Sequence, residues 1–138
     1  MTVEALRWKG DALELLDQRL LPDRIAYVTC RDAPQVAAAI RDMVVRGAPA
    51  IGCAAAYGVA LEAARLQPAA AGFPEGMNKA FDTLAGSRPT AVNLSWALER
   101  MRAVLATVSQ AQAAARLLEE ALRDVLGACA VVGQEDDE

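Results

Sequence analysis

Residues 46–52 read Arg-Gly-Ala-Pro-Ala-Ile-Gly, and they separate two helical patterns that together span residues 32–66. Gly47 can adopt a left-handed backbone conformation at no steric cost, so we expect it to end the first helix. Pro49 lacks a backbone N–H and suits the first turn of a new helix. The stretch therefore predicts a sharp junction between two helices, with Arg46 beside it.

The first of these helices has a clear start signal. Asp32 suits the N-cap, Pro34 the first turn, and Gln35 the return bond of a capping box. One apolar face then follows at helical spacing, formed by Val36, Ala39, Ile40, Met43 and Val44.

The second helix is uncharged over residues 48–61 and rich in alanine and glycine. A helix that is apolar all round is a buried one, and small side chains let neighbouring helices come close. The stretch is shorter than the roughly 20 apolar residues that cross a bilayer. We expect Glu62 and Arg65 to return the helix to solvent, so the pattern indicates a central core helix.

The flanking sequence completes the fold class. Alternating apolar residues and turn signals over residues 1–31 predict a small antiparallel β-meander, with strands around Leu6–Trp8, Leu13–Leu15 and residues 25–30. A short helix presenting Met77, Phe81 and Leu84 should end at Gly86. A further helix, capped by Thr90, follows with a stripe of Leu94, Ala97, Leu98, Met101, Val104, Leu105 and Val108. A last helix begins near Gln110 and presents Leu118, Ala121, Leu122 and Val125.

We therefore expect one α+β, mainly helical domain. The meander of residues 1–31 packs on a bundle of about five helices in residues 32–133, and residues 134–138 form an acidic tail. Without the four acidic residues that close the chain, positive and negative side chains balance, which argues against a nucleic-acid or membrane surface. Charged residues near the start, such as Glu4 and Arg7, break any signal peptide, so a cytoplasmic protein is expected.

Histidine is absent, which removes the commonest general base and metal ligand. The three cysteines, Cys30, Cys53 and Cys129, show no C-x-x-C spacing and predict neither a disulfide framework nor a zinc site. Cys53 is expected to be a small buried hydrophobe. The sequence also carries no Gly-x-Gly-x-x-Gly motif, no P-loop and no cluster of metal ligands, so the residues themselves point to no cofactor.

Two arginines share one setting. Arg46 and Arg88 each stand just before a proline-started helix, where free N–H groups and the helix dipole favour an anion. A guanidinium adds a bidentate clamp, so two such helix starts meeting over one pocket would hold a phosphate. The alternative reading is that both are surface arginines in ion pairs.

Candidates for acid–base chemistry are poor. Asp42, Asp82 and Glu99 are expected on wet helix faces without a second carboxylate beside them. Cys30, next to Arg31, has a polar setting that allows a lowered pKa, but the sequence offers it no partner base. The residues thus predict binding without catalysis.

Three motifs carry a family resemblance: Trp8-Lys9-Gly10, the Arg46–Gly52 run, and residues 87–94, Ser-Arg-Pro-Thr-Ala-Val-Asn-Leu. Together they resemble the 5-methylthioribose-1-phosphate isomerase family, over roughly residues 3–125. This group also includes ribose-1,5-bisphosphate isomerases and regulatory subunits of the translation-initiation guanine-nucleotide exchange factor. Within this group, the full Arg-Pro-Thr-Ala-Val-Asn-Leu run favours the methylthioribose enzyme.

The resemblance implies an aldose–ketose isomerase of methionine salvage that converts 5-methylthioribose 1-phosphate to 5-methylthioribulose 1-phosphate without a cofactor. It assigns substrate contacts to Arg46, Gly47, Ala48 and Arg88. The family's catalytic cysteine and aspartate belong to a second, α/β domain, and the three cysteines here do not match that motif. We therefore expect the N-terminal, substrate-binding domain alone, with no catalytic residue and no activity by itself.

Other readings stay open. The chain is expected to form a homo-oligomer or to need a C-terminal domain that is absent here. A non-catalytic assembly or regulatory domain of the same fold would also fit, as would a domain of the ribose-1,5-bisphosphate isomerase type.

Overall fold

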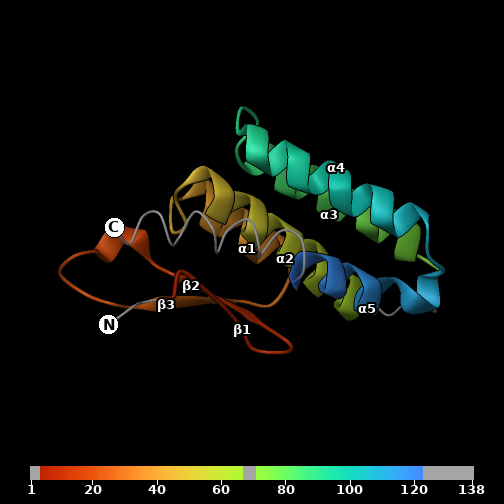
Figure 1. The fold of residues 1–138 in the computed structure, drawn as a ribbon, viewed down its shortest axis with the longest axis horizontal. Helices are drawn as coiled ribbons and strands as arrows, with labels where there is room; N and C mark the ends of the chain where they lie inside the picture. Colours follow the sequence, from red (N-terminus) through yellow and green to blue (C-terminus); the bar gives the residue numbers. More distant parts are fainter. Residues whose placement is uncertain (1–3, 67–70, 123–138) are drawn as a thin grey trace.

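The computed structural model describes residues 4–66 and 71–122, which form a small sheet and five helices (Figure 1). The sheet contains β1 (Leu6–Trp8), β2 (Leu13–Leu16) and β3 (Tyr27–Cys30), in the order β1-β2-β3 and antiparallel throughout. A short 3-10 helix, η1 (Gln18–Leu20), lies between β2 and β3. This antiparallel pairing confirms the predicted meander, although β3 begins at Tyr27 and not at residue 25. Leu13 and Leu15 of β2 are fully buried and belong to the core.

The helices are α1 (Ala33–Arg41), α2 (Ala48–Leu66), α3 (Phe73–Ser87), α4 (Val92–Ala106) and α5 (Gln110–Glu120). Helix α2 contacts each of the other four helices and also β2, so it is the centre of the fold. Figure 1 shows α3 and α4 packed together on one side of α1 and α2, with the sheet on the other. The mainly helical α+β class is therefore confirmed.

Helix α2 is central because small side chains allow close packing. Residues 51–63 are all buried, as the uncharged stretch predicted. A Cβ added to Gly58 would lie 3.2 Å from the Val36 side chain and 3.4 Å from that of Leu84, so α1 and α3 both pack onto the bare backbone here. Among the described residues, no helix combines the length and apolar character needed to span a membrane.

Glu62 corrects one prediction about α2. It does not return the helix to solvent: its side chain is buried and accepts a hydrogen bond of 3.0 Å from the Ala33 backbone N–H, at the start of α1. Its second oxygen pairs with Arg65, which is half exposed. A carboxylate can be buried here because the first N–H groups of α1 have no partner inside their own helix.

Helix α1 starts as predicted but ends earlier. The Asp32 carboxylate accepts from Gln35 N at 2.9 Å, which confirms the N-cap, and the Gln35 side chain accepts from Arg31 N. The predicted stop at Gly47 is wrong, because α1 ends at Arg41 and Met43 adopts the left-handed conformation, with φ 67°.

This early end is a Schellman motif. Met43 N–H donates to Ile40 O and Val44 N–H donates to Ala39 O, which satisfies the last carbonyls of α1. Met43 therefore turns outward and is 41% exposed, whereas Val44 is buried. Met43 does not belong to the apolar face predicted for this helix.

Smaller corrections concern the later helices. Helix α3 continues past Gly86 to Ser87, and α4 starts after Ala91 without a side-chain cap, so Thr90 does not cap it. The buried face of α5 is formed by Ala113, Leu117, Glu120 and Ala121, whereas Leu122 is exposed. Val125 lies outside the described residues, as do the predicted limit of the helical body at 133 and the acidic tail.

The cysteines also differ from the sequence expectation. Cys53 is buried in α2, as predicted, but its sulfur is disulfide-bonded. Cys30 at the end of β3 is a free, fully buried thiol.

Candidate functional site

Arg46 lies on the connection between α1 and α2. Gly47 follows it with φ 93°, a conformation that favours glycine, and α2 then begins at Ala48, with Ile51 N–H donating to Gly47 O at 3.0 Å. The Arg46 side chain is exposed and forms no ion pair or hydrogen bond with the described residues. Its guanidinium is therefore available beside the N-terminus of a long helix.

Arg88 has a different local setting from the one predicted. It is the C-cap of α3, and a turn closed by Ala91 N–H and Arg88 O separates it from α4. Its Nε–H donates to Ile40 O at 3.3 Å, at the end of α1. Within the described part of the chain, its two terminal amino groups form no hydrogen bond and no ion pair. The prediction that Arg88 directly precedes a proline-started helix is wrong.

The two motifs nevertheless meet. A Cβ added to Gly52 would lie 3.0 Å from the backbone oxygen of Asn93 and 3.7 Å from the Ala97 side chain. The first turns of α2 and α4 are thus in backbone contact, while Arg88 ties the end of α3 to the end of α1. The α1–α2 and α3–α4 connections, which carry Arg46 and Arg88, lie at the same end of the molecule (Figure 1).

The part of the chain that carries both arginines matches a known protein family. The model of the Initiation factor 2 subunit family matches residues 44–135, which include both arginine motifs. The chain belongs to this family.

Individual relatives point to one enzyme. Over 103 residues the chain is 60% identical to methylthioribose-1-phosphate isomerase of Albidiferax ferrireducens, in an alignment covering 74% of this chain and 29% of the relative. Over 122 residues it is 51% identical to the enzyme of the same name from Thioalkalivibrio sulfidiphilus, covering 88% of this chain and 35% of the relative. The chain thus spans about a third of the length of these relatives, and the resemblance drawn from the motifs is confirmed.

Two solved structures share the fold. The 5-methylthioribose 1-phosphate isomerase of Pyrococcus horikoshii superposes with a TM-score of 0.80 at 33% identity, covering 88% of this chain and 35% of that one. The translation initiation factor eIF-2B subunit delta from A. fulgidus gives the same TM-score at 37% identity, covering 88% and 36%. The fold of this family segment is therefore common to proteins named as an enzyme and as an initiation-factor subunit.

The acidic candidates singled out from the sequence keep the settings expected of them. Asp42 is the C-cap of α1 and pairs with Arg41 at 3.2 Å, while Asp82 and Glu99 are exposed, as predicted. Burial, with a smaller effect of the Asp32 charge, raises the pKa of the Cys30 thiol to about 11. The expectation that its pKa could be lowered is wrong, and the thiol stays protonated near neutral pH.

Proposed function

We propose that this chain is the substrate-binding part of an aldose–ketose isomerase that converts 5-methylthioribose 1-phosphate to 5-methylthioribulose 1-phosphate. The backbone contact between Gly52 and Asn93 carries the proposal, because it brings the Arg46 and Arg88 connections to one end of the bundle. The names of the relatives at 51–60% identity supply the substrate.

The proposed binding mode follows from the groups that these connections present. The guanidinium of Arg46 and the terminal amino groups of Arg88 supply charged donors to the phosphate. Gly47 and Ala48 supply backbone at the start of α2, where N–H groups without intrahelical partners and the helix dipole add to the attraction. The bond from Arg88 Nε–H to Ile40 O fixes the orientation of that guanidinium before the ligand arrives.

Binding alone does not move the proton that an aldose–ketose conversion requires. The reaction transfers a proton between C2 and C1 and needs a general acid and base near both carbons. The buried Cys30 thiol, with its pKa of about 11, is unsuited to this role. We therefore expect the 138-residue chain to bind the sugar phosphate and to show no turnover by itself.

Calorimetric titration with 5-methylthioribose 1-phosphate tests the proposal. Arg46→Ala and Arg88→Ala should each weaken binding by about tenfold or more, since a hydrogen bond to a charged group contributes about 1.5–3 kcal/mol. The matched control is Arg41→Ala, an exposed arginine near the same connection that already pairs with Asp42. Turnover by the chain, or equal losses in all three variants, would contradict the proposal.

Two alternatives are separated by the same variants. Tighter binding of ribose 1,5-bisphosphate, still dependent on Arg46, would identify the other sugar phosphate. The likeness to eIF-2B subunit delta favours an assembly role as the second candidate. That role predicts self-association in sedimentation experiments that Arg46→Ala leaves intact, with no sugar-phosphate binding to lose.

A further inference from the structure

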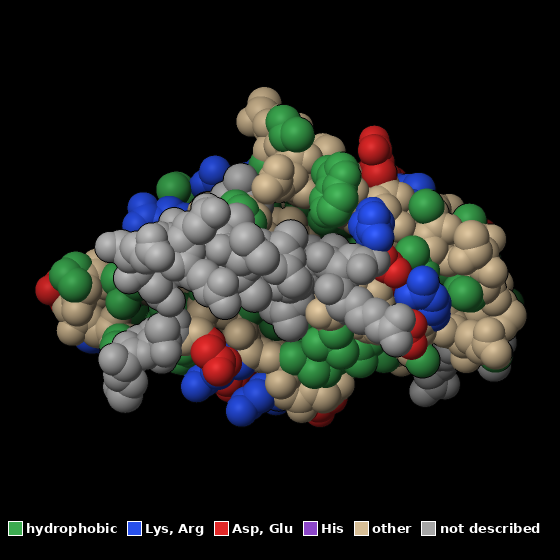
Figure 2. Space-filling model, in the orientation of Figure 1, with side chains coloured by type: hydrophobic (Ala, Val, Ile, Leu, Met, Phe, Trp, Pro, Cys, Tyr) green, Lys and Arg blue, Asp and Glu red, His purple; other side chains and the backbone are tan. Residues whose placement is uncertain are grey.

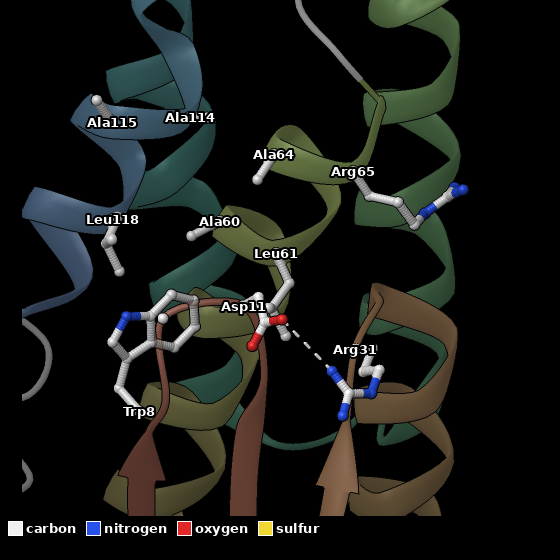
Figure 3. Close-up of a pocket in the computed structure, with 11 residues that line it drawn as sticks. Trp8, Asp11, Arg31, Ala60, Leu61, Ala64, Arg65, Ala114, Ala115 and Leu118 are labelled. Carbon is white, nitrogen blue, oxygen red and sulfur yellow. Dashed lines mark ion pairs between the residues drawn. The ribbon is translucent and has the colours of Figure 1, made fainter.

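A cavity of about 430 Å³ opens beside the sheet, toward the opposite end of α2 from Gly52 (Figure 3). Trp8 forms one wall, Ala60 and Ala64 of α2 form another, and Ala115 and Leu118 of α5 close the third. Its volume falls within the range of roughly 300–1,000 Å³ that holds small organic ligands. The proposed sugar-phosphate site uses none of these residues.

The position of the Trp8 side chain is fixed by packing against α2. Its indole stacks on the ring of Tyr57, with 5.2 Å between ring centroids and 15° between ring planes, and Tyr57 is itself buried in α2. Trp8 belongs to the Trp8-Lys9-Gly10 motif, which the proposed function leaves unexplained. A fixed aromatic face favours contact with an apolar group or a cation.

Two side chains of opposite charge, Asp11 and Arg31, also line the cavity. Arg31 Nη1 and Asp11 Oδ2 are 3.6 Å apart, beyond the roughly 2.7–2.9 Å of a charge-assisted hydrogen bond. Both side chains are mostly exposed, so their mutual attraction is weak and either can take another partner. Arg65 is directed away from Trp8 in Figure 3 and pairs with Glu62 instead.

We propose that this cavity binds an α-amino acid with an apolar side chain. The ammonium group binds Asp11, the carboxylate binds Arg31, and the side chain packs against Trp8 between α2 and α5. The ammonium and carboxylate groups of an α-amino acid are bonded to the same carbon, so they match an aspartate and an arginine that lie side by side. A simple amine or a simple acid would satisfy one charge and meet repulsion from the other.

The two tryptophans provide the measurement. In a ¹⁵N–¹H correlation spectrum each indole N–H gives one signal, and Trp96→Phe identifies the signal of Trp8. Titration with L-phenylalanine should move the Trp8 signal to saturation. The Trp96 signal should stay in place, because Trp96 lies on α4 and does not line the cavity.

Matched ligands and variants decide the chemistry. Phenethylamine and 3-phenylpropionate, which each lack one charge, should bind at least tenfold more weakly than phenylalanine. Asp11→Asn and Arg31→Gln should each cost about tenfold, while Arg102→Gln on α4 should change nothing. Ala64→Leu should fill the cavity and abolish the shift, and Ala64 is exposed enough for the larger side chain not to disturb the core.

The remaining signals of each variant's spectrum report whether it is folded. The proposal is overturned by an unmoved Trp8 signal, by equal shifts of both indoles, by unchanged binding to a folded Ala64→Leu protein, or by an amine or acid that binds as well as phenylalanine.

Discussion

Gly52 of α2 and Asn93 of α4 meet backbone to backbone, with no room for a methyl group between them. A Cβ at position 52 would lie 3.0 Å from the Asn93 carbonyl oxygen, which is part of a helix start and cannot rotate away. This contact sets the spacing of the two connections that carry Arg46 and Arg88.

Gly52→Ala should therefore destabilise the protein and weaken sugar-phosphate binding together. Overpacking costs about 1–3 kcal/mol, and the better helix propensity of alanine returns only about 0.5–1 kcal/mol. We expect a net loss of about 1 kcal/mol in the free energy of unfolding, measured by urea denaturation.

Gly86→Ala is the matched control, because Gly86 is also helical and its Cβ would meet nothing within 4 Å. In this variant the higher helix propensity of alanine is not opposed by overpacking, so the free energy of unfolding should rise by about 0.5–1 kcal/mol. The same sign of change in both variants would show that the Gly52–Asn93 contact is not tight.

The buried Glu62 carboxylate links α2 to the start of α1. Glu62→Ala should lower the free energy of unfolding by about 2–4 kcal/mol, because the Ala33 N–H then loses its partner and the side chain leaves a void. Glu62→Gln should cost less, since its amide oxygen can still accept from Ala33 N–H.

Glu99→Ala on the exposed face of α4 serves as the control and should change stability by less than about 0.5 kcal/mol. Thermal melts followed by circular dichroism would rank the three variants. A loss in Glu62→Ala no greater than in Glu99→Ala would show that the link does not contribute to stability.

Sequence reasoning predicted those parts of the fold that depend on local signals. The Asp32 cap, the meander and the buried uncharged helix each follow from residues close together in the chain, and each is present. The end of α1 was missed because Gly47 was taken as the stop signal. The helix in fact ends at Arg41, and Met43, four residues before Gly47, adopts the left-handed conformation. Residues other than glycine rarely adopt a positive φ, so the sequence gives no sign of this helix end. It is visible only in the Schellman hydrogen bonds of Met43 and Val44.

The candidate site could be predicted only in part for a similar reason. Motif spacing indicated that Arg46 and Arg88 belong together, but not that Arg88 caps α3 and bonds to Ile40 O. Contacts across the fold leave no periodic signal in the sequence. The burial of Glu62 was hidden in the same way, since a charged residue at the end of an apolar run normally marks a return to solvent.

Asp17 should make stability depend on pH. It is buried, and its two oxygens accept from Arg19 Nε and Nη2 at 2.9 Å, which lowers the pKa of this carboxyl. A pKa that is lower in the folded state gives stability above the ordinary pKa of aspartate, and this is lost as the pH falls through the folded value.

Asp17→Asn should therefore cost about 1 kcal/mol near pH ~7, a value kept small because Arg19 is half exposed. The difference from the unchanged protein should shrink as the solution is acidified below the ordinary pKa of aspartate, about 3.9. Asp23→Asn, at an exposed turn position, is the control and should change the free energy of unfolding near pH ~7 by less than about 0.5 kcal/mol in urea denaturation. A gap for Asp17→Asn that stays constant with pH would contradict the assignment.

Cys30 should be chemically inert while the protein is folded. Its thiol is fully buried and burial raises its pKa to about 11, so at pH ~8 only about one molecule in a thousand carries the reactive thiolate. Iodoacetamide should therefore alkylate Cys30 at least a hundredfold more slowly in the native protein than in urea, as followed by mass spectrometry of the peptide that contains it. The unfolded protein is the internal control, because unfolding removes the burial that raises the pKa. Comparable rates in the two states would mean that β3 opens to solvent far more readily than its packing against α1 implies.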